Sequence, residues 1–320
     1  MSSSTLHALG LFSLGLVSGG AIVYSTRQRT AQLDAPALVP AGRMTPDLAP
    51  QNSTMSPATI LQFGLPGPIA DVSIKQGFVA GYERRMRNPA WVAEHLTSEK
   101  LAQKDGNRGK SVFFEEVSIP PKFRAKLADY ARSGYDRGHQ VPAADCKFSQ
   151  QAMDETFSLM NICPQVGDGF NRDYWAHFED FCRRLTRQYK SVRVITGPLY
   201  LPRQHEDGKW RVTYEVIGSP ASVAVPTHFF KVIVADQGRP GETPAVGGFV
   251  LPNAMIPNET KLTDFLVPVD AIERASGLEL LSRLPQNKRL ELCRQVDCSI
   301  VVRFFENNKQ KALPAPRSKL

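Results

Sequence analysis

The chain has 320 residues, of which 39 are Lys or Arg and 31 are Asp or Glu, so its net charge is +8 and its pI is near 9.3. This basic excess favours encounter with a polyanion by long-range attraction, but it does not distinguish a nucleic acid from an acidic membrane surface. Five cysteines without a Cys-x-x-Cys pair argue against a framework of disulfides, and we see no internal repeat.

The N-terminal region is predicted to contain a membrane-directed segment over residues 1–30. An apolar stretch of 17 residues runs from Ala8 to Tyr24 and is followed by Arg27 and Arg29. Its length is at the lower limit for a helix that spans a membrane. Residues 31–60 are rich in Pro, Ala, Ser and Thr, which predicts a flexible linker. The chain beyond it is long enough for one α+β domain, which we place at residues 61–306, followed by a basic disordered tail at 307–320.

Hydrophobic periodicity predicts several strands and helices within this domain. The predicted strands cover residues 111–114, 156–159, 192–196, 210–217, 228–235 and 246–251. The predicted helices cover residues 122–131, 170–189, 270–276 and 286–294. Cys293 and Cys298 are close enough in sequence to form a disulfide in an oxidising compartment, but we favour packed free thiols as the default.

The most informative stretch is Tyr-Asp-Arg-Gly-His-Gln-Val-Pro, which runs from Tyr135 to Pro142. Hydrolysis of a phosphodiester near neutral pH needs a base, and histidine is the side chain whose ordinary pKa suits that task, which points to His139. Gly138 permits a tight turn or a close approach of the backbone, while Arg137 can meet phosphate charge. A lone histidine is more often structural, so this reading depends on the residues that precede it.

An amide and a carboxylate further along the chain are suited to a hard divalent cation. Asn171 and Glu179 fall within the predicted helix 170–189, and their spacing of about two turns would aim both toward one cation. The alternatives are that Asn171 caps the helix and that Glu179 is a solvated carboxylate paired with Arg183. A metal held by one amide must take its remaining ligands from water and from the substrate phosphate.

These residues resemble the sugar-nonspecific DNA/RNA nucleases that carry a ββα-metal (His-Me) finger, whose signature is Asp-Arg-Gly-His followed by a metal-binding asparagine. The longer pattern, with Asn-Ile-Cys-Pro-Gln from Asn161 and Asn-Arg-Asp-Tyr-Trp from Asn171, is similar to the mitochondrial endonuclease G family, above all its fungal members. The resemblance implies a central, mainly antiparallel sheet flanked by helices.

The same resemblance assigns roles to individual residues. It implies that His139 is the general base, Asn171 the direct metal ligand and Glu179 the carboxylate that holds metal-bound waters. Arg137 would neutralise phosphate charge, and Arg108 matches the arginine that acts on the transition state, with plain solvent exposure as its alternative. Asn161 would orient its neighbours rather than bind metal directly.

The resemblance finally implies an activity and a setting. We expect Mg²⁺-dependent hydrolysis of DNA and RNA, single- and double-stranded, by a one-metal mechanism that leaves 5′-phosphates, with Mn²⁺ as the alternative cation. A homodimer and a place at the mitochondrial inner membrane or in the intermembrane space are also implied, with the nucleus as a location after release. The rival hypotheses are a noncatalytic basic nucleic-acid-binding module and a membrane-tethered interaction protein, and a cleavage assay with EDTA separates the nuclease from both.

Overall fold

The structure is a computed structural model that describes residues 56–64 and 71–302. The predicted membrane segment, the linker up to residue 55 and the basic tail lie outside the described residues. Among the helices of the described part, none has the length and apolar character needed to cross a membrane. The described body already includes the short helix α2 (Pro57–Ile60), whose Ile60 is buried, so packed structure begins a few residues before the predicted boundary at 61.

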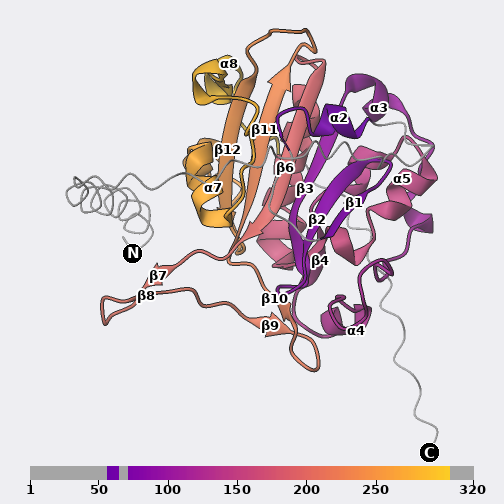
Figure 1. The fold of residues 1–320 in the computed structure, drawn as a ribbon, viewed down its shortest axis with the longest axis vertical. Coiled ribbons are helices and arrows are strands. Elements are labelled where there is room, and N and C mark those ends of the chain that lie inside the picture. Colours follow the sequence, from indigo (N-terminus) through magenta and orange to yellow (C-terminus); the bar gives the residue numbers. More distant parts are fainter. Residues whose placement is uncertain (1–55, 65–70, 303–320) are drawn as a thin grey trace, which may run out of the picture. The chain divides into compact units, whose positions relative to one another are not determined.

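A seven-stranded sheet forms the centre of the described body, in the order β1-β2-β3-β6-β11-β12-β13 (Figure 1). Its neighbouring strands are antiparallel, except for the parallel pair of β12 and β13. The strands are β1 (Asp71–Ile74), β2 (Phe78–Glu83), β3 (Asn88–Leu96), β6 (Ser191–Leu199), β11 (His228–Asp236), β12 (Ala245–Pro252) and β13 (Leu290–Glu291). This arrangement confirms the predicted central sheet, which is mainly antiparallel.

Helices cover both faces of the sheet. The long helix α6 (Tyr174–Leu185) buries Phe178 against a core that includes Phe229 and Ile233 of β11. The alternate residues of β11, such as Val232, face the second core with Ile272 of α7 (Val269–Ser276). Burying each such side chain contributes roughly 1.5–3 kcal/mol, so the alternation of β11 fixes which residues face α6.

A separate pair of strands leads into α6. The strand β4 (Asp136–His139) pairs antiparallel with β5 (Ile162–Gln165), and the chain then passes through a π-helical segment, Gly167–Asn171, into α6. Between the two strands lie α5 (Gln150–Glu155) and two short 3-10 turns. The order β4, β5, α6 is the ββα arrangement expected from the resemblance.

Several predicted elements are confirmed and others change. Residues 192–196, 228–235 and 246–251 lie in β6, β11 and β12, and residues 270–276 form most of α7. The predicted strand 210–217 is wrong over most of its length: only β8 (Trp210–Arg211) and β9 (Val216–Ile217) are strands, pairing with β7 (Arg203–Gln204) and β10 (Val223–Ala224). Its alternating side chains are mostly exposed because the segment belongs to an arm outside the main sheet (Figure 1).

The remaining differences are local. Residues 111–114 and 156–159 are not strands but are joined by one parallel bridge between Phe114 and Ser158. The helix predicted at 122–131 shortens to α4 (Leu127–Tyr130), because the side chain of Asp129 accepts from the backbone N–H of Lys126 and starts the helix there. The helix predicted at 286–294 divides into a 3-10 turn, β13 and α8 (Leu292–Gln295). The strands β1 to β3 and the helix α3 (Ser98–Ala102) were not predicted.

The cysteines differ from the expected default at one pair. Cys293 and Cys298 form a disulfide with Cα atoms 5.3 Å apart, so the favoured prediction of free thiols is wrong for them. Cys293 lies in α8 and Cys298 lies just beyond the end of this helix, so the turn of the chain brings the two residues within disulfide reach. Cys146, Cys163 and Cys182 are buried free thiols, as expected.

Candidate active site

His139 is the last residue of β4, and two phenylalanine rings hold its imidazole. The ring centroid lies 5.4 Å from that of Phe113 and 4.8 Å from that of Phe157, which it meets edge to face. The residue is only 8 % exposed, and its Nε2 is buried without a hydrogen-bond partner among the described residues. A buried polar atom without a partner is costly, so it marks a position where a ligand or a water is expected to bind.

The two predicted arginines stack on the same two rings. The guanidinium carbon of Arg137 lies 4.3 Å from the centre of Phe113, and that of Arg108 lies 5.2 Å from the centre of Phe157. Burial, and then the positive charges of Arg108 and Arg137, lower the pKa of His139 to about 3. The imidazole is therefore neutral at physiological pH and able to accept a proton, while an approaching phosphate would favour its charged form.

Asn171 lies before α6 rather than on it. It ends the π-helical segment, in which Gly169 has a left-handed φ of 76°, and the N-cap of α6 is Asp173. The prediction that Asn171 and Glu179 share one continuous helix is thus wrong, because the backbone departs from helical geometry at Asp173. The alternative that Asn171 caps this helix is wrong as well.

The contact that orients Asn171 comes from the histidine strand. Its Nδ2 donates to Oδ2 of Asp136, 2.9 Å away, and Nε of Arg172 lies 3.5 Å from the same carboxylate oxygen. Because the amide nitrogen faces Asp136, the Oδ1 atom is the one available to a cation. No group of three or more His, Cys, Asp or Glu side chains in the described part could hold a metal, which fits a site with a single amide ligand completed by water and substrate.

Glu179 is half-buried on α6, and its ionisation is strongly perturbed. Burial raises the pKa of its carboxyl to about 7, although Lys231 and Arg183 oppose this rise. Arg108 also attracts Glu179, so it interacts with both the carboxylate and His139. The alternative paired Glu179 with Arg183 at the surface of the helix. In the structure Arg183 forms ion pairs with Asp145, at 2.8 Å, and with Asp180, at 3.8 Å.

A buried lysine beside α6 was not predicted from the sequence. Lys231 is fully buried on β11, its Nζ donates to Thr196 Oγ1 at 2.9 Å, and the same atom lies 4.6 Å from the ring centre of Trp175. Thr196 of β6 pairs with Lys231 on one side and with Val92 of β3 on the other. Glu94 lies two residues beyond Val92 on β3, so its side chain is on the same face of the sheet as that of Lys231. A lysine within an otherwise apolar strand pattern was the available signal.

Asn161 and Gly138 help to fix the chain around His139, one by hydrogen bonds and the other by close packing. Asn161 is buried, and its side chain accepts from the N–H of Val141 and donates to the carbonyls of Val141 and Thr156. These bonds hold the chain that follows His139, which is compatible with the predicted orienting role. At Gly138 a Cβ atom would lie 2.0 Å from Oε1 of Gln165, so glycine is needed for close packing in a strand rather than for a turn.

The chain is similar in sequence to known nucleases. The family model for DNA/RNA non-specific endonucleases matches residues 56–287. The chain is 52 % identical to the mitochondrial nuclease of Saccharomyces cerevisiae, over 97 % of each chain. It is 51 % identical to the mitochondrial Nuclease 1 of Schizosaccharomyces pombe, over 97 % of this chain and 98 % of the relative.

Its fold is also that of a solved relative. A crystal structure of the EndoG/EndoGI complex matches with a TM-score of 0.70 and 44 % identity, covering 75 % of this chain and 98 % of that one. Membership of the family implies a metal-dependent nuclease, and the two fungal relatives are mitochondrial. The chain belongs to the DNA/RNA non-specific endonuclease family.

Proposed function

We propose that this endonuclease uses His139 as the general base to hydrolyse phosphodiesters of DNA and RNA, in single- and double-stranded form, leaving 5′-phosphates. The observation that carries the proposal is the neutral imidazole of His139. Its Nε2 has no hydrogen-bond partner among the described residues, and the positive charges of Arg108 and Arg137 help to lower its pKa. A base needs a free lone pair, and a phosphodiester needs positive charge nearby.

The donor set fits a single Mg²⁺ ion, with Mn²⁺ as the alternative. Oδ1 of Asn171 would hold the cation directly, and the carboxylate of Glu179 would hold waters bound to it. When bound, the cation supplies charge stabilisation at the departing 3′ oxygen.

The side chains then have distinct tasks. His139 takes a proton from the attacking water, and the oxygen of that water bonds to phosphorus as the bond to the 3′ oxygen breaks, so the phosphate stays on the 5′ side. Arg108 and Arg137 offset the charge on the phosphate oxygens, since each guanidinium group stacks on one of the two rings that hold His139. No step uses the 2′-hydroxyl, so both DNA and RNA qualify as substrates.

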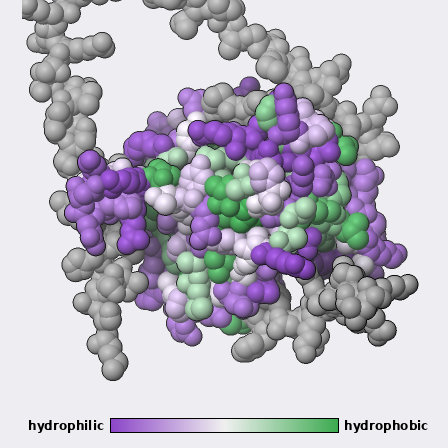
Figure 2. All heavy atoms as spheres, turned by 90° about the horizontal axis from the view of Figure 1, so that it is seen from below, coloured by the Kyte–Doolittle hydropathy of each residue, from purple (hydrophilic) through white to green (hydrophobic). Residues whose placement is uncertain are grey.

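We also propose that the protein is a homodimer. Its location would be the mitochondrial inner membrane, to which the N-terminal segment attaches it, or the intermembrane space, with action in the nucleus after release. Support for self-association comes from the arm, where Trp210, Val212, Tyr214 and Val216 are exposed. Figure 2, which views the molecule from the lower end of Figure 1, shows apolar residues in the middle of this face with hydrophilic residues around them. Light scattering of the purified protein tests this, and a monomer at micromolar concentration would refute it.

The activity is tested by digestion of supercoiled plasmid and of RNA with Mg²⁺ or with EDTA, followed by analysis of the product ends. We expect both substrates to be cut only with the cation and to carry 5′-phosphates. Products with 3′-phosphates, or cleavage that persists in EDTA, would contradict the proposed mechanism. Binding without cleavage would favour the noncatalytic alternative.

A further inference from the structure

The two rings that hold His139 come from segments that are bonded to each other. The N–H of Phe114 donates to the carbonyl of Phe157 at 3.2 Å, and the N–H of Leu159 donates to the carbonyl of Phe114 at 2.9 Å. Residues 113–116 and 157–159 therefore form one paired unit, which we term the ring support. Each of its two segments contributes one phenyl ring to the imidazole.

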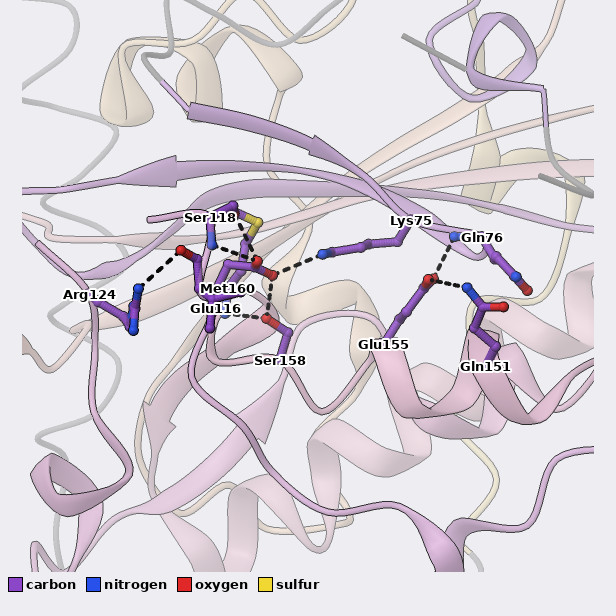
Figure 3. Close-up of polar contacts among 10 residues, drawn as sticks. Lys75, Gln76, Glu116, Ser118, Arg124, Gln151, Glu155, Ser158 and Met160 are labelled. Carbon is purple, nitrogen blue, oxygen red and sulfur yellow. Dashed lines mark hydrogen bonds and ion pairs between the residues drawn. The ribbon is translucent and has the colours of Figure 1, made fainter. Parts of the chain in front are cut away.

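A buried carboxylate joins the segments of the ring support at Glu116. This residue is only 6 % exposed, and Figure 3 shows its carboxylate between donors from three places in the chain. Lys75 Nζ donates at 2.9 Å from the turn between β1 and β2, Ser118 Oγ at 2.8 Å, and Ser158 Oγ at 2.9 Å from the second segment. The carboxylate thus ties the ring support to the edge of the central sheet.

The charge of Glu116 is maintained despite its burial. Burial is the largest single influence and raises the pKa of this carboxyl, but the bond and charge of Lys75 and the bonds from Ser118 and Ser158 together outweigh it and lower the pKa to about 2. A carboxylate has about four acceptor positions on two oxygens, so it can accept from all three donors at once, which a hydroxyl cannot. An apolar pair of equal volume often stabilises a fold as well as a buried ion pair does, so stability alone gives no reason for a charge here.

We propose that Glu116 is a positioning residue for the reaction, which holds Phe113 and Phe157 against His139 through the ring support. The inference rests on the proposed role of His139 as the base. The rings keep the imidazole buried and set the direction of Nε2, and Glu116 fixes the rings through its bond to Ser158. Arg108 and Arg137 are the charged groups that act on His139, and both stack on these rings.

Ser158→Ala is the sharpest variant, because it removes the bond between Glu116 and the second segment and leaves the ion pair between Lys75 and Glu116 in place. It also removes the bond that Ser158 Oγ accepts from the N–H of Met160, while the backbone bonds between the two segments remain. Glu116→Ala removes the bonds from all three side chains, together with the bond that the carboxylate accepts from the N–H of Ser118. Glu155→Gln is the matched control: Oε2 of Glu155 accepts from the N–H of Gln76 at 2.6 Å and so braces the same turn between β1 and β2 (Figure 3). Glu155 contacts the ring support only through its backbone carbonyl, which accepts from the N–H of Ser158 and which the substitution leaves in place.

Two measurements on the full chain test the proposal. The first separates kcat from KM on a duplex substrate with Mg²⁺. We expect kcat to fall about tenfold in Ser158→Ala and further in Glu116→Ala, with KM within about twofold of wild type, because small displacements of a reacting group reduce rate more than binding. Glu155→Gln should match wild type in both constants.

The second measurement follows the imidazole of His139 by NMR titration of histidine-labelled protein in EDTA, assigned with His139→Ala. As the rings loosen, the pKa of His139 should rise toward its ordinary value in Ser158→Ala and Glu116→Ala but not in Glu155→Gln. If thermal unfolding shows reduced stability while kcat and the titration of His139 stay at wild-type values, Glu116 is only structural and the proposal is wrong. Should Glu116→Ala fail to fold, Ser158→Ala decides.

These outcomes are separate from failure of the proposed function. If His139→Ala cut as fast as wild type, the function of His139 would be refuted, whereas the NMR titration would still report whether Glu116 holds the rings.

Discussion

Glu179 destabilises the metal-free fold, and a neutral isostere should remove that cost. Its half-buried carboxyl lies on α6, where burial raises the pKa from 4.5 to about 7. In Glu179→Gln the side chain keeps its size and cannot ionise. We therefore expect this variant to be more stable than wild type without metal, while losing the carboxylate that would hold metal-bound waters.

The sign and size of the effect follow from the two pKa values. Below pH about 4.5 the carboxyl is protonated in both the folded and the unfolded chain, so it costs nothing. Between pH 4.5 and about 7 the unfolded chain releases a proton that the folded chain retains, so stability falls as the pH rises, and above that range the loss is constant. A rise from 4.5 to about 7 corresponds to a cost of about 3 kcal/mol.

Urea unfolding in EDTA at pH 5 and pH 8 measures this difference, with Glu206→Gln on the exposed arm as the control. Glu179→Gln should raise the free energy of unfolding by about 2–3 kcal/mol at pH 8 and by little at pH 5. Glu206→Gln should have little effect at either pH. A gain that is equal at the two pH values, or a loss of stability at pH 8, would refute the assigned environment of Glu179.

Two further predictions concern the groups around the candidate cation site. Asp136→Ala frees the amide of Asn171, so the Mg²⁺ concentration for half-maximal cleavage should rise by about tenfold to a hundredfold, and an unchanged requirement in a Mg²⁺ titration would show that Asp136 does not orient the amide. Lys231→Met removes a buried positive charge that opposes the rise in the pKa of Glu94, which burial and then Asp145 set well above its ordinary value. Urea unfolding should therefore show a larger loss of stability at pH 8, where the carboxyl is forced to ionise, than at pH 5, where it is neutral in the fold. Adding Glu94→Gln should remove the difference between the two pH values, and a loss that is equal at pH 5 and pH 8 would contradict the attraction between Lys231 and Glu94.

Features encoded over short stretches of chain were predictable. Strand β11 shows apolar alternation over several residues, and burial of Phe229 and Val232 on opposite faces follows from it. The Asp-Arg-Gly-His run drew attention to His139 because base, arginine and glycine are adjacent in sequence. The structure adds that Gly138 is required by close packing of Gln165.

Features that depend on contacts between distant segments were not predictable from the sequence. The rings around His139 come from Phe113 and Phe157, and neither position carries a local signal for this contact. The break before α6 arises from the backbone at Asp173, which apolar periodicity does not register. In β3, the buried Glu94 interrupts the apolar pattern, because its environment is set by the neighbouring strands and helix.

The central claim is that His139 is the base, and single-turnover cleavage by His139→Ala tests it most directly. His95→Ala is the matched control, since His95 on β3 also has a pKa lowered to about 3, first by burial, but its Nε2 meets Ser191 Oγ at 2.7 Å. The rate of His139→Ala should fall by about 10³–10⁴-fold with DNA binding in EDTA unchanged, while His95→Ala cuts at nearly the wild-type rate. Wild-type cleavage by a folded His139→Ala protein would contradict the claim.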